Sequence, residues 1–188
     1  ETIGSVTFDS FQKGKELTEY LIQQGHQKIG FIIGKVGIYD SNERYKGFLT
    51  AMDAAGLAVD SQHVYHGEFE LEPAYQCLTD FLKTTPSNKY PTAIIAGNDL
   101  SAIGAYKAIC DFQLRVPEDI SLVSFDGFDL EASERPNLTG IHNPIYEQAR
   151  LSVEHLIAMI HREKTGEAIT IKGHFVEGNT VRQMMKER

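Results

Sequence analysis

Three short runs of apolar residues constrain the fold of this chain more than any other feature. They read KIGFIIG at residues 28–34, PTAIIAG at 91–97 and DISLVSF at 119–125. Each run is continuous rather than alternating, which is typical of strands buried on both faces of a parallel sheet. Between the runs, apolar residues recur at helical spacing, for example over residues 71–82. Strands that alternate with helices predict right-handed βαβ crossovers, and hence an α/β fold with a doubly wound parallel sheet.

Local signals place the ends of several helices. Gly25 is predicted to end a helix over residues 11–24, because glycine is favoured just after a helix. Asp40 and Glu43 have the spacing of a capping box and predict the start of a second helix. Asn98 follows the second apolar run and is predicted to cap the next helix.

The last third of the chain has a different character. A short strand is predicted at residues 138–143, a long helix at 146–162, and one alternating, edge-like strand at 169–176. A further brief strand is predicted around Val6, at the start of the chain.

Composition narrows the class of protein. The chain has 188 residues and a formal net charge of -8, which argues against a surface that wraps a phosphate backbone. Cys77 and Cys110 are too few for a disulfide framework. No apolar run approaches the roughly 20 residues that span a bilayer, and no secretory signal opens the sequence. We therefore expect a soluble, cytoplasmic protein that binds neither membrane nor, through this chain, nucleic acid.

Polar side chains and one aromatic residue follow the predicted strands, which include a short one at residues 63–66. In doubly wound sheets ligands bind outside the carboxyl ends of the strands, so these residues should share one rim. They are Arg44, Phe69, Asn98 and Asp126, with Asp99 beside them. Guanidinium, amide and carboxylate groups match the vicinal hydroxyls of a sugar, and an aromatic ring covers its apolar face. The set predicts a carbohydrate site without a nucleophile.

Each of these residues also has a purely structural interpretation. Asn98 can serve only as a helix cap, and Asp126 with Gly127 only as a turn. Arg44 is predicted to lie in the first turn of a helix, where a surface ion pair is the default explanation. Phe69 alone would more often belong to a core.

Motifs for phosphate binding, metal binding and nucleophilic catalysis are incomplete or absent in the sequence. A phosphate loop needs Ser or Thr after its lysine, where this chain has Val36. His63 and His66 are spaced for a metal, but on a short strand they point to opposite faces. No nucleophile elbow occurs. We therefore expect no metal, no cofactor and no catalytic residue.

Five segments in order resemble the lactose/galactose-repressor family of bacterial transcription regulators and cover nearly the whole chain. They read LIQQGHQKIGFIIG, ERYKGFLTAM, PTAIIAGNDLSAIGAYKAI, RVPEDISLVSFDGFD and RPNLTGIHNP. The VPEDIS stretch is the most discriminating, because exported sugar receptors share the fold but usually lack it. The resemblance implies a two-lobed, periplasmic-binding-protein-like effector domain that closes on a ligand and controls a helix-turn-helix head.

The resemblance also implies roles for individual residues. Arg44, Asn98 and Asp126 would contact a small carbohydrate effector, and Phe69 would stack on it. Asn143 stands where the family often has Gln and would contribute a shorter contact.

The resemblance implies a division into lobes as well. Residues 6–141 would form most of the second lobe, 143–165 would cross into the first lobe, and 166–188 would return. Ser5–Thr7 and His142–Pro144 would lie near the hinge. Since the matching begins partway through the family's sensor, the DNA-binding head and much of the first lobe are expected to be absent from this chain.

Partners follow from the same resemblance. It implies a homodimer, with the helix Ser101–Asp111 and the loop after Asp126 as candidate contacts. Operator DNA would be bound only through the absent head. Packing of Ile103, Tyr106 and Ile109 on the sheet is the plainer interpretation of that helix.

Three other functions stay open from the sequence. The first is an exported, periplasmic-type sugar receptor that feeds a transporter. The second is an α/β enzyme that uses Asp99 and Asp126 as an acid/base pair. The third is a variant of the regulator in which a phosphoprotein docks as corepressor.

Overall fold

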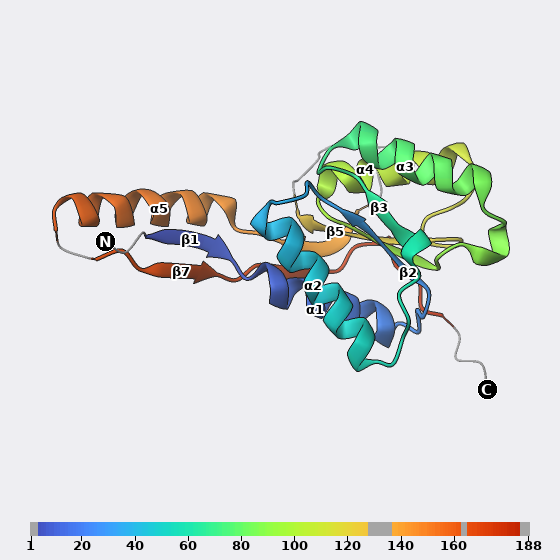
Figure 1. Cartoon of the computed structure of the whole chain (residues 1–188), viewed down its shortest axis with the longest axis horizontal. Coiled ribbons are helices and arrows are strands. Elements are labelled where there is room, and N and C mark those ends of the chain that lie inside the picture. The colour runs from blue at the N-terminus through green and yellow to red at the C-terminus, as the bar shows by residue number, and fades with distance from the viewer. Residues whose placement is uncertain (1–3, 128–136, 163–164, 185–188) are drawn as a thin grey trace.

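The computed structural model describes residues 4–127, 137–162 and 165–184, and its strands divide between a six-stranded and a two-stranded sheet (Figure 1). The strands are β1 (Ser5–Phe8), β2 (Ile29–Ile33), β3 (Val64–His66), β4 (Ala93–Ala96), β5 (Ser121–Asp126), β6 (Thr139–His142), β7 (Ala168–Ile171) and β8 (His174–Val176). The α-helices are α1 (Ser10–Gln23), α2 (Tyr39–Ala54), α3 (Leu71–Thr84), α4 (Asp99–Asp111) and α5 (Ile145–Ile160).

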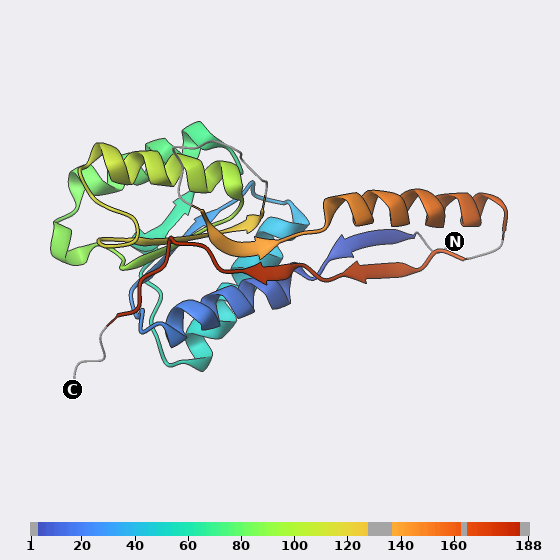
Figure 2. The same ribbon diagram turned by 180° about the vertical axis from the view of Figure 1, so that it is seen from behind.

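The larger sheet has the order β3-β2-β4-β5-β6-β8. Its first five strands are parallel, and β8 pairs antiparallel with β6. Helices α1 and α2 cover one face, and α3 and α4 cover the other, as the front and back views show (Figures 1 and 2). The predicted α/β fold with a doubly wound, mainly parallel sheet is confirmed.

Burial on both faces explains the continuous apolar runs. Within β2, Phe31 packs with Phe48 on the α1 and α2 side, whereas Ile32 packs with Leu78 on the α3 and α4 side. All four side chains are fully buried. Because neighbouring residues of a strand point to opposite faces, a strand between two helical layers must be apolar at nearly every position. Each such side chain contributes roughly 1.5–3 kcal/mol by leaving water.

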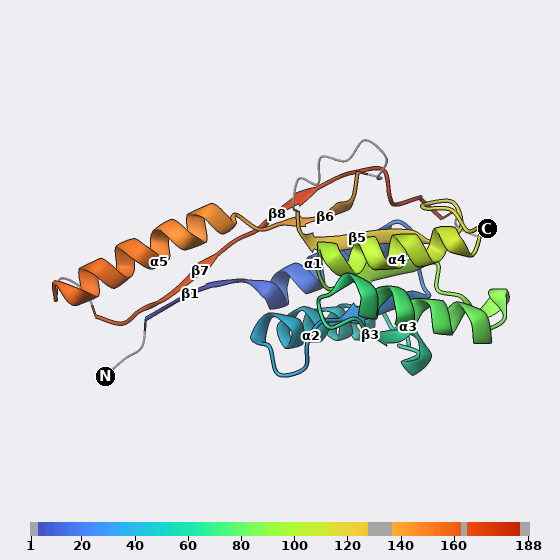
Figure 3. The ribbon, with the colours of Figure 1, turned by 90° about the horizontal axis from the view of Figure 1, so that it is seen from above.

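The two-stranded sheet and α5 extend away from the larger sheet (Figures 1 and 3). Strands β1 and β7 pair in parallel, and α5 packs against β1. We call β1, β7 and α5 the arm, and the larger sheet with helices α1 to α4 the sheet domain. None of the helices in the described ranges is both long and apolar enough to cross a membrane.

Three connections join the arm to the sheet domain. They lie at Asp9, at Asn143–Pro144 and at Lys172–Gly173. The last two are adjacent in space, since a Cβ placed on Gly173 would lie 2.5 Å from the Asn143 side-chain oxygen. The second connection falls within the predicted hinge segment His142–Pro144, and the first follows shortly after Ser5–Thr7.

Two local predictions are wrong. Residues 169–176 do not form one strand, because the chain breaks at Lys172–Gly173 and its halves join different sheets. Asp40 makes no capping box, since α2 begins after Ile38 without a side-chain cap. The Asp40 carboxylate instead accepts a 2.7 Å hydrogen bond from the Ser10 hydroxyl at the start of α1.

Two helix-end predictions are confirmed. Gly25 follows the end of α1 with a φ of 93°, and its N–H bonds to the carbonyl of Ile22. The Asn98 side chain accepts a hydrogen bond from the Ser101 N–H and caps α4.

Candidate ligand-binding site

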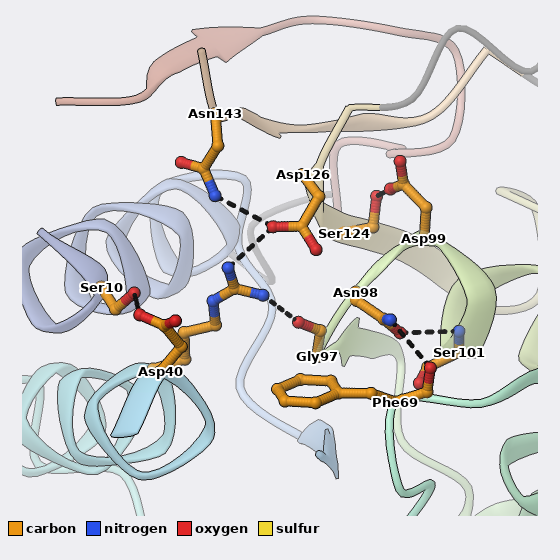
Figure 4. A network of polar contacts seen from close by, with 11 residues as sticks. Ser10, Asp40, Phe69, Gly97, Asn98, Asp99, Ser101, Ser124, Asp126 and Asn143 are labelled. Carbon is orange, nitrogen blue, oxygen red and sulfur yellow. Dashed lines mark hydrogen bonds and ion pairs between the residues drawn. The ribbon is translucent and has the colours of Figure 1, made fainter. Parts of the chain in front are cut away.

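Five predicted site residues gather at the carboxyl edge of the larger sheet. Arg44 enters from α2, Phe69 follows β3, Asn98 follows β4, Asp126 ends β5 and Asn143 follows β6. Figure 4 shows the four labelled members of this group converging on one region. Parallel strands deliver their carboxyl ends to one edge, which is why residues so distant in sequence meet here.

Arg44 is the centre of the cluster. One of its terminal nitrogens (Nη1) donates to the carbonyl of Gly97 at 2.5 Å, and the other (Nη2) to Asp126 Oδ1 at 2.7 Å. Its side chain is only 5% exposed, and its Cζ lies 4.7 Å from the centre of the Phe125 ring. The expected surface ion pair is therefore a buried one, in which loss of one partner leaves an uncompensated charge.

Asp126 links the cluster to the arm. Its Oδ1 accepts hydrogen bonds from both Arg44 and the amide nitrogen of Asn143, the latter at 2.9 Å. The backbone N–H of Asn143 also donates to the Asp126 carbonyl at 3.2 Å. Because Asn143 lies at a connection to the arm, the charged pair is bonded directly to the segment that joins the two parts of the molecule.

The backbone of Asp126 adopts an uncommon conformation. Its φ is 89°, in the left-handed region that side chains other than glycine rarely occupy. Such a conformation persists only where the surroundings impose it, and here the two hydrogen bonds to its carboxylate do so. The Asp–Gly turn and the polar contact are therefore one feature rather than alternatives.

Phe69 is held as a platform beside Arg44. Its φ of 64° is also left-handed, and its ring centre lies 5.8 Å from the Arg44 Cζ. The ring rests on Gly34, where an added Cβ would lie 2.2 Å from it. Gly34 is a member of the site that sequence reasoning missed, although its position at the end of an apolar run is a usable signal.

Asn98 holds this platform in place. Its side-chain oxygen caps α4, and its nitrogen donates to the Phe69 carbonyl at 2.9 Å (Figure 4). The capping role and a role in the site thus coexist in one side chain. In this arrangement the Asn98 side chain joins the start of α4 to the backbone of Phe69.

Asp99 does not join the cluster as a second exposed acid. Its side chain is buried, and Oδ1 accepts a 2.6 Å hydrogen bond from the Ser124 hydroxyl. Asp126 belongs to a separate network with Arg44 and Asn143. This geometry gives no support to an acid/base pair formed by Asp99 and Asp126.

His63 and His66, which are spaced in sequence for a metal, have different surroundings in the structure. His63 is buried and its Nε2 donates to the Lys89 carbonyl, whereas His66 is exposed. Among the described residues, no group of three or more His, Cys, Asp and Glu side chains is arranged to hold a metal ion.

A family model described as a periplasmic binding protein-like domain matches residues 18–181. The HTH-type transcriptional repressor PurR of Pasteurella multocida is 37% identical over 167 residues, covering 88% of this chain and 48% of the relative. PurR of Haemophilus influenzae is 36% identical over 157 residues, covering 84% and 46%. The chain spans about half the length of the curated relatives it matches.

Solved structures show the same architecture. A complex of the transcriptional regulator CelR with cellobiose superposes with a TM-score of 0.87 at 25% identity, over 96% of this chain and 54% of that one. A LacI family transcriptional regulator from Enterococcus faecium with bound ribose also gives a TM-score of 0.87 at 25% identity, over 97% and 67%.

Proposed function

This chain belongs to the lactose/galactose-repressor (LacI) family through its periplasmic-binding-protein-like domain, and from that premise we propose that it senses a small carbohydrate effector for a transcription regulator. The effector binds at the cluster of Arg44, Phe69, Asn98, Asp126 and Asn143. Binding alters how a separate helix-turn-helix domain of the same protein engages operator DNA.

One observation carries the proposal. The buried pair of Arg44 and Asp126 is bonded to Asn143, at a connection between the sheet domain and the arm. A ligand that displaces or extends these bonds changes the relative energy of two arrangements of the arm. It shifts their populations only by its difference in affinity for the two.

The chemistry of the cluster favours a neutral polyol. Arg44 and Asp126 offset each other's charge, so neither an anion nor a cation is favoured by a net charge. Planar amide and carboxylate groups suit adjacent hydroxyls, and the Phe69 ring suits the apolar face of a sugar. The two solved relatives that carry cellobiose and ribose support the same class of ligand.

The arm belongs to a first lobe whose remaining elements come from a segment of the same protein outside this chain. Four apolar side chains of α5 are 48–66% exposed, namely Val153, Leu156, Ile157 and Ile160. Parallel strands are normally covered on both faces, and the matched relatives are about twice as long as this chain. On this division, residues 6–141 lie mainly in the second lobe, 143–165 cross to the first, and 166–188 return.

The regulator is favoured over an exported sugar receptor, since the curated relatives are named as repressors. We further propose that it is a cytoplasmic homodimer without enzymatic activity. Helix α4 is a candidate contact, although Ile109 on it is buried in the core. The loop after Asp126, the other candidate, lies beyond Gly127 outside the described residues.

Calorimetry on the complete protein tests the ligand class. We expect at least one sugar in a panel of mono- and disaccharides to bind, and Phe69→Ala to weaken that binding tenfold or more. Phe175→Ala serves as the matched control, because Phe175 is an exposed aromatic residue on β8 whose ring centre lies 4.7 Å from that of Tyr20, a residue outside the cluster. No measurable binding of any sugar, sugar phosphate or nucleoside would overturn the proposal. Binding of nucleosides alone would overturn its carbohydrate part.

A further inference from the structure

Two histidines lie side by side where the sheet domain meets the arm. His142 ends β6 and His174 begins β8, and they are direct partners in the antiparallel pairing of these strands. Their ring centres are 5.7 Å apart, with 55° between the ring planes. The two residues are far apart in the sequence, so only the pairing of β6 with β8 brings them together.

Both rings are available to a ligand. No hydrogen bond joins either imidazole to another residue in the described part of the chain. His174 is exposed, and His142 is half-buried. The His142 ring is seated on Gly127, where an added Cβ would lie 2.1 Å from it. One ring is therefore held by the turn that follows Asp126, and the other reaches it from the surface.

The separation of the two ring centres fits a shared metal ion. Neutral imidazole binds zinc at about 2.0–2.1 Å, and two rings on one ion place their centres roughly 5–6 Å apart. We propose that His142 and His174 form a two-ligand site for a divalent transition ion that prefers imidazole, such as Zn²⁺ or Ni²⁺. Water completes the coordination, since the described residues supply no third ligand of the His, Cys, Asp or Glu type at this place.

The position gives such an ion a mechanical effect. It joins the strand that precedes Asn143 to the strand that follows Gly173, and so ties together two of the three connections to the arm. His142 is also the register partner of Asp126 in the pairing of β5 with β6. The ion therefore restrains the segment to which the Arg44–Asp126 pair is bonded. The site itself does not depend on the identity of the effector.

The test uses the complete protein without an affinity tag, after dialysis against a chelator. Calorimetric titration with ZnCl₂ or NiCl₂ should show saturable binding that His142→Ala and His174→Ala each weaken tenfold or more. His66→Ala is the matched control, because His66 is also exposed but lies on β3 at the opposite edge of the sheet. Its affinity should equal that of the unmodified protein.

Thermal unfolding provides a second measurement. Zinc should raise the Tm of the unmodified protein and of His66→Ala, because an ion that binds only the folded state stabilises it. It should not raise the Tm of His174→Gln, whose exposed position keeps the fold intact. Equal zinc affinity in all variants, or no saturable binding at millimolar zinc, would overturn the proposal.

Discussion

Helices α4 and α5 show how differently the two parts of the molecule bury similar sequences. Both are rich in apolar residues, yet α4 buries seven of its 13 residues and α5 buries only His155 among 16. Helix α4 lies on a sheet whose other face is also covered, whereas α5 lies on a sheet of two strands in the described part of the chain. Apolar composition therefore predicts that a helix needs a partner, but it does not say whether this chain supplies one.

The largest expected difference between the two parts comes from matched core and arm substitutions. Phe48→Ala removes a fully buried ring of the sheet domain and should lower the free energy of unfolding by about 3–5 kcal/mol. Leu156→Ala removes a side chain that is 57% exposed on α5 and should change it by less than about 0.5 kcal/mol in this chain. Urea unfolding followed by circular dichroism measures both.

The Leu156→Ala substitution should have a different effect in the complete protein. There the proposed first lobe should bury α5, so Leu156→Ala should cost about 2–4 kcal/mol. An unchanged stability in the complete protein would contradict the proposed covering of the arm.

The next largest effect concerns the ion pair between the two parts. Asp126→Ala leaves the Arg44 guanidinium buried without its charged partner and should cost about 2–4 kcal/mol. Asp119→Ala breaks a surface pair with Arg115 and should cost less than about 1 kcal/mol. If urea unfolding shows that both variants lose the same free energy of unfolding, the Arg44–Asp126 pair stabilises the protein no more than a surface pair does.

A pH-dependent effect should arise within the sheet domain. Burial lowers the pKa of His26 to about 4. Its Nε2 donates to the Arg182 carbonyl, and its Nδ1 lies 2.9 Å from the Thr92 hydroxyl oxygen. In the unfolded chain His26 takes up a proton near pH 6.5, whereas in the folded chain it does so only near pH 4. The contribution of neutral His26 to the free energy of unfolding is therefore fully present above about pH 6.5. It is lost as the pH falls towards 4, by up to about 1.4 kcal/mol per pH unit.

Urea unfolding between pH 7.5 and 4.5 (roughly the window set by these two pKa values) measures this slope. His26→Gln should be less stable at neutral pH but should show a flatter dependence. An equally steep slope in the variant would assign the effect to other groups.

The smallest expected effect separates the two roles of Asn98. Asn98→Ala removes both the helix cap and the bond to the Phe69 carbonyl and should cost about 1–2 kcal/mol. Asn98→Asp keeps a capping oxygen but loses the donor to that carbonyl. It should therefore retain most of the stability while weakening sugar binding severalfold in calorimetry. Full sugar affinity in Asn98→Asp would show that the Phe69 platform needs no such support.

Much of the site could be anticipated because it follows a rule of topology. Parallel strands end at one edge, so the residues after each strand were predictable as neighbours, and Arg44, Phe69, Asn98 and Asp126 do meet there. What could not be anticipated is how they are bonded. The burial of Arg44, the left-handed backbone of Phe69 and the seat on Gly34 depend on contacts between segments distant in sequence.

By itself the sequence determined the class of the fold, since continuous apolar runs between amphipathic helices leave only a two-faced parallel sheet. It also determined local helix ends such as Gly25 and Asn98, where one side chain or its absence satisfies the backbone. Only the tertiary structure decided that residues 168–176 divide between two sheets and that β1 leaves the main one. The reason is physical: periodicity shows that a segment is a strand, but its place depends on which distant strands offer hydrogen bonds to it.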